Sequence, residues 1–252
     1  MASIKNPHIR PYDFTKTDIA ILKNYGSLHP GELQNMKVFW PLYLEAHTKN
    51  VHVVNSIFVY ENKKILMDGI ITPSIKQIVR ENLRKQISKK RFLYITLMII
   101  SEDGLQAHAN GLLYDAKSKN LQRYEPHGVD GPAYVNISCT VVKKIKHAFE
   151  NIFGVKIKRF EQPVSTCPKI GFQKLQKFGL LFNAKFNRQW KISGYCAAWC
   201  VYYMILRANN PTYTSKALQT QAFEDYENTS DYIHQFYYDF LRWKIEFLKH
   251  LM

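Results

Sequence analysis

The sequence lacks long hydrophobic runs and has no apolar segment at its start. Its longest apolar stretches, such as Phe92–Ile100, are far shorter than the ~20 residues that a helix needs to cross a bilayer. The first residues, MASIKNPHIRPYDF, do not contain the hydrophobic core of a secretory signal. We therefore expect an intracellular protein that has no membrane partner.

Cysteine, glycine and proline are scarce, with 4, 11 and 10 residues in a chain of 252. The low glycine and proline contents exclude collagen-like and linker-like sequences. Four cysteines without a secretory signal favour reduced thiols. Cys196 and Cys200 share the spacing of one helix face, but no CxxC or HxxxH motif accompanies them. We predict neither a metal site nor a cofactor.

Acidic residues number only 20 against 35 Lys and Arg, which gives a formal net charge of +15. Such a surplus concerns partners and solubility rather than fold. It has two interpretations: a solvated basic surface, or a surface that binds a polyanion such as DNA without sequence specificity. The one dense basic run of the sequence is Arg84–Arg91, and no zinc-finger or RNP motif stands beside it.

The hydrophobic pattern predicts an α+β chain rather than a regular alternation of strands and helices. A central strand is expected at Phe92–Ile100, which is apolar almost throughout. A hairpin is expected from His108–Tyr114 and Leu121–Glu125, which a polar, turn-rich loop connects. The helical spacing of apolar residues predicts helices at 141–153, 196–209 and 230–251.

These elements suggest three parts of the chain. Residues 1–91 are predicted to form an N-terminal extension of helices and a hairpin. Residues 92–215 are predicted to form the core, and residues 216–252 a C-terminal helix that packs on it.

Three residues of reactive type fall at the ends of the expected elements. His108 opens the first strand of the hairpin and Glu125 ends the second, so the two can be cross-strand neighbours. Cys196 begins a helix, where unpaired N–H groups and the helix dipole favour a thiolate and can hold an oxyanion. A carboxylate that orients an imidazole beside a thiol is an arrangement for nucleophilic catalysis.

Taken singly, each of these residues has an ordinary structural alternative. A buried cysteine is usually a small core residue, and a histidine on a strand is usually structural. Asn110 and Asp115 are alternative partners for the imidazole, but only Glu125 falls at the end of the paired strand. We expect His127 to be a loop residue rather than a second base, and Cys200 to be packed and inert.

Four segments resemble a clan of cysteine proteases that contains the adenovirus maturation protease and the SUMO- and ubiquitin-like-protein proteases. The resemblance is closest to members encoded by large DNA viruses of eukaryotes. As in the adenovirus enzyme, a His starts a strand, a Glu precedes Pro and Gly, and a Cys begins a helix with a second Cys four residues on. The segments are His108-Ala-Asn110, Arg123-Tyr-Glu-Pro-His-Gly128, Cys167-Pro-Lys-Ile-Gly-Phe-Gln173 and Gly194-Tyr-Cys-Ala-Ala-Trp-Cys200.

The resemblance implies a papain-like, ubiquitin-like-protease fold, in which a central mixed β-sheet is packed between helices and the catalytic Cys lies at a helix N-terminus. It implies that Cys196 is the nucleophile, His108 the general base and Glu125 the residue that orients it. A Gln completes the oxyanion hole in this family. Gln173 is favoured by its Cys-Pro-x-x-Gly-x-Gln context, and Gln189 is the alternative because it has the usual spacing before the Cys.

The implied activity is hydrolysis of peptide or isopeptide bonds in a protein substrate, within the host cytoplasm or the virion. The substrate would be a viral polyprotein or, alternatively, a ubiquitin-like conjugate. Because the adenovirus counterpart uses DNA as a cofactor, the basic surplus could serve DNA binding here. Two other functions stay open: an acetyltransferase with the same three residues, and a non-enzymatic basic virion or nucleic-acid-binding protein. Ala109 and Ala197 replace residues common in the family, which weakens a deSUMOylase assignment more than the triad.

Overall fold

The computed structural model describes residues 14–25, 34–61, 64–67, 73–87, 89–130, 137–167, 171, 195–227 and 232–251. Within these residues, a six-stranded mixed sheet has the strand order β2-β1-β3-β4-β5-β6. The strands are β1 (Val51–Glu61), β2 (Lys64–Met67), β3 (Phe92–Ile100), β4 (Ala107–Asp115), β5 (Asn120–Tyr124) and β6 (Arg159–Glu161). The chain is α+β, as predicted.

The strand β3 lies inside the sheet and is buried on both faces. It runs parallel to β1 and antiparallel to β4, and its apolar residues alternate between two helical layers. Tyr94 faces one layer, whereas Ile95 and Leu97 face the other. The prediction of a central strand over Phe92–Ile100 is therefore confirmed.

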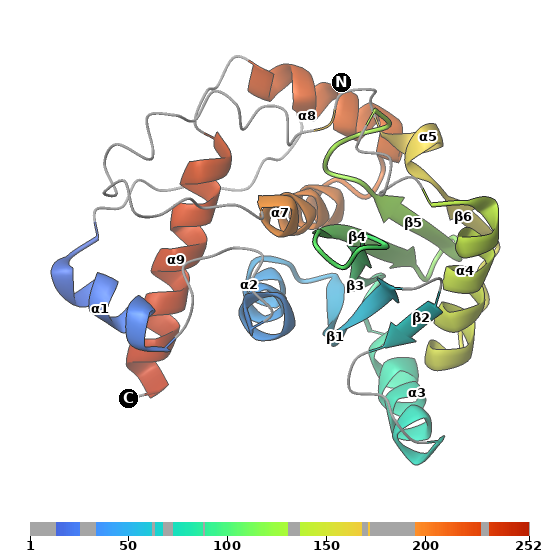
Figure 1. Ribbon diagram of the computed structural model, residues 1–252, viewed down its shortest axis with the longest axis horizontal. Helices are drawn as coiled ribbons and strands as arrows, with labels where there is room; N and C mark the ends of the chain where they lie inside the picture. The colour runs from blue at the N-terminus through green and yellow to red at the C-terminus, as the bar shows by residue number, and fades with distance from the viewer. Residues whose placement is uncertain are drawn as a thin grey trace.

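Helices cover both faces of the sheet (Figure 1). On one face lie α2 (Trp40–His47) and α7 (Tyr195–Asn209), with α9 (Tyr232–Leu251) packed against them. On the other face lies α4 (Cys139–Phe153), with α3 (Pro73–Ile87) beside it. The C-cap of α4 is Gly154, whose φ of 65° is left-handed, and the helix predicted at 141–153 is confirmed.

The other helical segments are α1 (Lys16–Tyr25), the π-helical turn η1 (Asn35–Phe39), α5 (Pro163–Thr166) and α8 (Ser215–Glu227). None of the described helices combines the length and the apolarity that crossing a bilayer requires.

Residues before the predicted start of the core take part in the same sheet. β1 pairs with β3 from Val51 opposite Phe92 to Tyr60 opposite Ile99, and β2 pairs with β1. The division into 1–91, 92–215 and 216–252 stays a prediction. The sheet nevertheless runs across residue 91, so the N-terminal part contributes two strands to the structure that holds the hairpin.

The C-terminal part contains two helices where the sequence analysis predicted one. α8 precedes α9 and has only a weak apolar stripe, which explains why the pattern did not reveal it. α9 packs on α2 through aromatic rings: Trp40 stacks on Phe240 with 3.6 Å between centroids. Tyr43 also donates a hydrogen bond of 2.8 Å to Asp239. These contacts fasten the last helix to the layer that contains α7.

Candidate active site

The predicted contact between an imidazole and a carboxylate is present. His108 is the second residue of β4, and Glu125 directly follows β5, whose pairing with β4 reaches Gly111 opposite Tyr124. Nε2 of His108 lies 2.6 Å from Oε1 of Glu125, and both residues are only 2% exposed. Because the carboxylate occupies Nε2, the ring has Nδ1 left for a second partner.

The helix α7 brings Cys196 to the same place. It begins at Tyr195, so Cys196 lies in its first turn, as predicted. Sγ of Cys196 accepts a hydrogen bond from the N–H of Ala109 at 3.5 Å, and Sγ of Cys200 donates to the carbonyl oxygen of Ala109 at 3.5 Å. The residue after His108 is thus held between two sulfur atoms one helical turn apart. Burial raises the pKa of the Cys200 thiol, which fits the inert role predicted for it.

The charges of these residues are coupled. Burial disfavours the charged form of His108, but the Glu125 carboxylate and a hydrogen bond with the Cys196 side chain outweigh it and raise the pKa of His108 to about 10. Burial also opposes ionisation of Glu125, but His108 and the charge of Arg123 lower its pKa. At neutral pH, His108 is therefore an imidazolium and Glu125 a carboxylate.

A tight turn after β5 holds the carboxylate in place. The N–H of Gly128 donates to the carbonyl oxygen of Glu125 at 3.0 Å, and the N–H of His127 donates to Oε1 of Glu125 at 2.9 Å. The His127 ring also lies against the His108 ring, with 4.7 Å between centroids. His127 is in a loop, as predicted, but the sequence analysis did not foresee its contact with the imidazole.

Gly171 packs against this turn with no room for a side chain. Its N–H donates to the carbonyl oxygen of His127 at 2.9 Å, and a Cβ at this position would overlap backbone atoms of residues 126–128. Gly171 belongs to the Cys-Pro-x-x-Gly-x-Gln segment of the sequence. The turn that carries the buried carboxylate therefore touches the segment that leads to Gln173.

Gly171→Ala is expected to push the turn and this segment apart. Because the opposing atoms are backbone, we expect a loss of about 1–3 kcal/mol in the free energy of unfolding. Urea denaturation measures this loss, and Gly104→Ala is the matched control. Gly104 has a positive φ of 72°, which Gly171 does not have, and a Cβ there meets nothing within 4 Å, so the control contains a conformational cost and no overlap. Equal losses in the two variants would contradict the close approach at Gly171.

The two candidates for the oxyanion hole, Gln173 and Gln189, lie outside the described residues. Among the residues that are described, no three His, Cys, Asp or Glu side chains are grouped so that they could hold a metal ion.

The alternative partners of the imidazole, Asn110 and Asp115, have different contacts. Asp115 ends β4, far from His108, and its carboxylate lies 2.9 Å from a guanidinium nitrogen of Arg91. Asn110 accepts a hydrogen bond of 3.1 Å from Arg123, and both of these residues are buried. This buried pair was not predicted from the sequence. The spacing could have indicated it, because Asn110 lies two positions from His108 and Arg123 two positions from Glu125. Strand residues two positions apart share a face.

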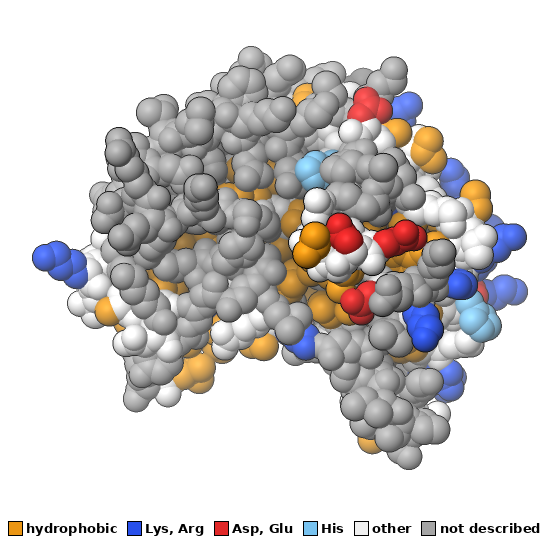
Figure 2. Space-filling view, viewed as in Figure 1, with side chains coloured by type: hydrophobic (Ala, Val, Ile, Leu, Met, Phe, Trp, Pro, Cys, Tyr) orange, Lys and Arg blue, Asp and Glu red, His pale blue; other side chains and the backbone are white. Residues whose placement is uncertain are grey.

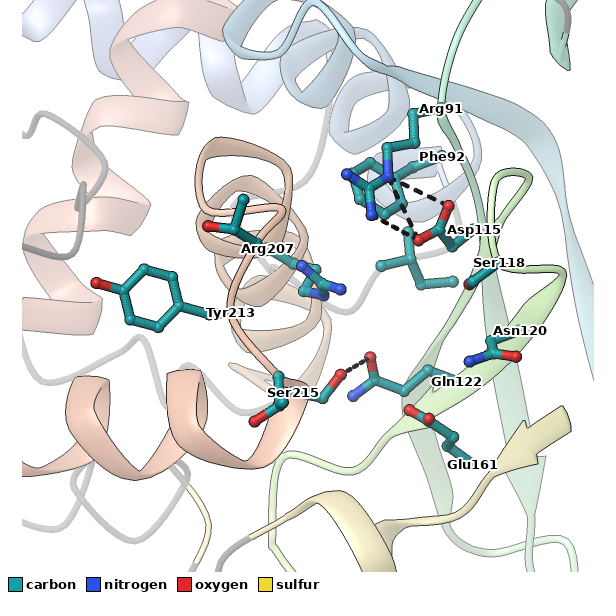
Figure 3. A pocket seen from close by; sticks show the side chains of 13 residues that line it. Arg91, Phe92, Asp115, Ser118, Asn120, Gln122, Glu161, Arg207, Tyr213 and Ser215 are labelled. Carbon is teal, nitrogen blue, oxygen red and sulfur yellow. Dashed lines mark hydrogen bonds and ion pairs between the residues drawn. The ribbon is translucent and has the colours of Figure 1, made fainter. Parts of the chain in front are cut away.

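A cavity of about 280 Å³ lies at the opposite end of the hairpin (Figure 3). Its polar lining residues include Arg91, Gln122, Glu161, Arg207 and Ser215. The described residues that line it do not include His108, Glu125 or Cys196. His108 and Asp115, which lines the cavity, are seven positions apart on β4, or about 23 Å at the usual rise of a strand. The cavity is therefore distinct from the candidate active site.

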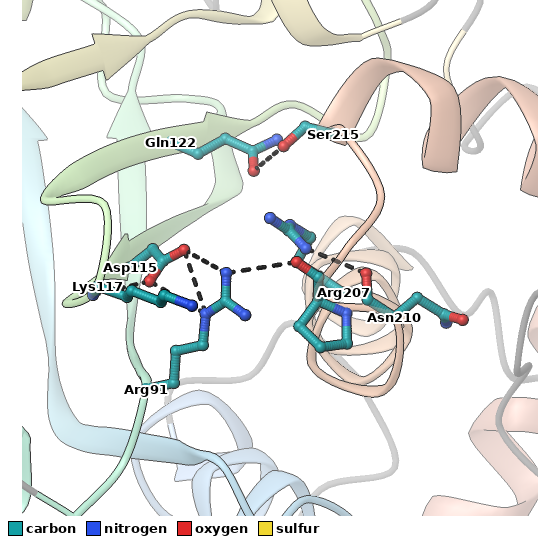
Figure 4. A network of polar contacts seen from close by, with 8 residues as sticks. Arg91, Asp115, Lys117, Gln122, Arg207, Asn210 and Ser215 are labelled. Atoms are coloured by element: carbon teal, nitrogen blue, oxygen red, sulfur yellow. Dashed lines mark hydrogen bonds and ion pairs between the residues drawn. The ribbon is translucent and has the colours of Figure 1, made fainter.

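Polar contacts beside this cavity fasten the C-terminal end of α7 to the sheet (Figure 4). Arg91 donates to both carboxylate oxygens of Asp115 and to the carbonyl oxygen of Pro211, which follows α7, at 3.3 Å. Oγ of Ser215 donates to Oε1 of Gln122 at 2.7 Å. Since sulfur contacts hold the other end of the helix, α7 is attached to the sheet at both ends. This attachment fixes the position of its first turn.

No protein-family model matches the chain. Over 186 residues, or 70% of the chain, the sequence is 26% identical to a protein of Acanthamoeba polyphaga mimivirus that is named as an ankyrin repeat protein. The matched stretch spans 23% of the length of that protein. Ankyrin repeats are helical pairs with a period of about 33 residues, whereas the described part of this chain is built on a mixed sheet. The similarity is to a viral protein and does not assign the chain to a family.

Proposed function

We propose that the chain is a cysteine peptidase with the papain-like fold of the adenovirus-protease and SUMO-protease clan. One observation carries the proposal: the imidazole of His108 contacts both the buried carboxylate of Glu125 and the side chain of Cys196 in the first turn of a helix. The segments that resemble the clan contain all three residues. A mixed sheet with helices on both faces is compatible with the fold that the resemblance implies.

In the proposed reaction, Cys196 attacks the carbonyl carbon of a peptide or isopeptide bond as a thiolate. The carbon–nitrogen bond breaks as His108 donates a proton to the leaving amine, and the acyl group stays on sulfur as a thioester. A water molecule then gives a proton to His108 and attacks the thioester, which releases the carboxylic acid and restores the free sulfur. Glu125 orients the ring and offsets its positive charge in both steps.

The tetrahedral intermediates of this reaction carry a negative oxygen that needs hydrogen-bond donors. The N–H of Cys196, in the first turn of α7, is proposed as one donor. The side chain of Gln173 is proposed as the second. It follows Gly171 by two residues in the sequence. Gln189 is the alternative, although no contact among the described residues favours it.

The proposed substrate is a viral polyprotein, cleaved in the host cytoplasm or the virion. The similarity to a protein of Acanthamoeba polyphaga mimivirus supports a viral setting. A ubiquitin-like conjugate is the alternative substrate, because the same attack on a carbonyl carbon cleaves an isopeptide bond.

DNA is proposed as a second partner that binds without sequence specificity. Lys and Arg side chains lie along the right-hand edge of the molecule in Figure 2, where α4 lies in the same view of Figure 1. Exposed basic residues of α4 and of the segment after it are Lys143, Lys144, Lys156, Lys158 and Arg159. Side chains of this kind neutralise phosphates and carry no sequence information by themselves.

The experiment that tests the proposed activity treats the full chain with an electrophilic thiol probe and with candidate substrates. We expect iodoacetamide at neutral pH to label Cys196 faster than Cys139, although Cys139 is the exposed cysteine, because the thiolate is the reacting form. Peptide mapping by mass spectrometry identifies the labelled residue. Cleavage is followed on virion polyproteins and on ubiquitin-like proteins that carry a fluorescent leaving amine.

Two outcomes of this experiment would contradict a peptidase. Labelling confined to Cys139, without cleavage of any substrate, would favour a non-enzymatic basic protein. Transfer of a labelled acetyl group from acetyl-CoA to another protein would favour an acetyltransferase that uses the same residues.

A further inference from the structure

A second pair of polar side chains is buried next to the candidate triad. Arg123 of β5 and Asn110 of β4 are 4% and 0% exposed, and Nη1 of Arg123 donates to Oδ1 of Asn110 at 3.1 Å. The proposed reaction uses neither residue. A guanidinium cannot lose its charge in a protein, and burying a charge is costly. The position of Arg123 therefore needs an explanation.

The register of the hairpin puts this pair beside the triad. Residues two positions apart on a strand share a face, so Asn110 follows His108 on one face of β4, and Arg123 precedes Glu125 in the same way. The charges of Arg123 and Glu125 interact, and each favours the charged form of the other. Both residues are buried, so solvent screens this interaction only weakly.

We propose that Arg123 is a positioning residue that keeps Glu125 ionised as the pH falls, so that its carboxylate continues to orient His108 and to offset the charge of the imidazolium. The effect on Glu125 is independent of the proposed peptidase activity, whereas its consequence for catalysis rests on that activity. Glu125 needs a cation because burial alone would raise its pKa. Asn110 holds the guanidinium from the neighbouring strand.

Other titratable groups also surround Glu125 and Arg123. They are His108, Tyr124, His127, Cys167, Cys196 and Cys200. Burial raises the pKa values of Tyr124 and Cys200, which keeps these two groups neutral. Unlike the imidazoles of His108 and His127, the guanidinium of Arg123 has a positive charge that does not depend on pH.

The experiment follows the carboxyl carbon of Glu125 by carbon-13 NMR during an acid titration of the full chain with Cys196→Ala. We expect Arg123→Met to raise the titration midpoint of Glu125 by about one pH unit or more. Arg123→Lys, which keeps the charge, should reverse most of this shift. Arg159→Met is the matched control, because it removes a positive charge from an exposed residue of β6 and should leave the midpoint unchanged.

In the chain that retains Cys196, the rate of iodoacetamide labelling reports on the same coupling. The ratio of the rate in mild acid to the rate at neutral pH should fall about tenfold in Arg123→Met. The ratio should not change in Arg159→Met. This readout separates an electrostatic role from a general loss of structure, which would slow labelling at both pH values.

An unchanged Glu125 midpoint in folded Arg123→Met would overturn the inference. If that variant does not fold, Asn110→Asp takes its place, because Asp has nearly the shape of Asn and brings a competing carboxylate to the guanidinium. It should also raise the Glu125 midpoint, and an unchanged midpoint overturns the inference here too. Failure of the peptidase proposal looks different: Cys196 would not be labelled, while the midpoint of Glu125 would still depend on Arg123.

Discussion

Replacement of Cys196 by Ala is expected to slow hydrolysis of any substrate by at least about 10³-fold, because it removes the atom that forms the thioester. The change deletes one buried sulfur and keeps a good helix former in the first turn of α7. The N–H of the buried Ala109 loses its acceptor, so the free energy of unfolding should fall by about 1–3 kcal/mol. Initial rates of cleavage and thermal unfolding measure the two effects separately.

Two other cysteines provide matched controls for this result. Cys139 is exposed at the start of α4, and Cys139→Ser should retain full activity. Cys200→Ala removes the second sulfur contact with Ala109, one turn along α7. It should lower stability by a similar amount and retain turnover. Turnover that survives Cys196→Ala, or that disappears in Cys139→Ser, would contradict the assignment of the nucleophile.

Glu125→Gln is expected to slow the same reaction by about 10²- to 10⁴-fold while the fold is kept. The amide fills the space of the carboxylate but has no charge to stabilise the imidazolium at 2.6 Å. It can also present either its oxygen or its NH₂ group to Nε2, so the tautomer of His108 is no longer fixed. Burial then dominates, and the pKa of His108 falls.

The pH profile of the reaction tests the direction of this change. In the wild type, the pKa of His108 is raised from 6.5 to about 10, so the imidazolium is lost as the pH rises through the higher value. The stability that it contributes is present below pH 6.5 and is lost over the same rise. In Glu125→Gln, the alkaline loss of activity should therefore begin at a lower pH.

A control variant in the same hairpin separates this coupling from a general effect of charge. Asp115→Asn removes a carboxylate at the far end of β4, where it pairs with Arg91, and should leave the alkaline limb unchanged. Circular dichroism over the same pH range separates inactivation from unfolding. An alkaline limb at the same pH in the wild type and in Glu125→Gln would show that the carboxylate does not control His108.

The elements that carry the candidate site could be predicted because each has a strong local pattern. β3 is apolar along its length, which is typical of a strand buried on both faces. The hairpin of β4 and β5 has a polar turn between two strands, and the contact of His108 with Glu125 was expected from their places at the ends of these strands. The first turn of α7 was also predicted at Cys196. Local periodicity and strand geometry are sufficient for these features.

Other features depend on contacts between distant segments, which a local pattern does not contain. The burial of Arg123 runs against the usual exposure of arginine and becomes understandable only with Asn110 and Glu125 beside it. The packing of Gly171 on the turn after β5 joins segments that no spacing rule connects. α8 was missed because its apolar stripe is weak, so only its packing identifies it.

The sulfur atoms of Cys196 and Cys200 both bind the backbone of Ala109, so the proposed reaction at Cys196 would affect the contact between β4 and α7. Sγ of Cys196 is both the proposed nucleophile and the acceptor for the amide of Ala109, so acylation of this sulfur would make it a weaker hydrogen-bond acceptor. Cys200 meanwhile keeps its bond to the carbonyl oxygen of the same residue. In the proposed thioester, β4 would keep the hydrogen bond between the carbonyl oxygen of Ala109 and Cys200, while the hydrogen bond from the N–H of Ala109 to Cys196 would weaken.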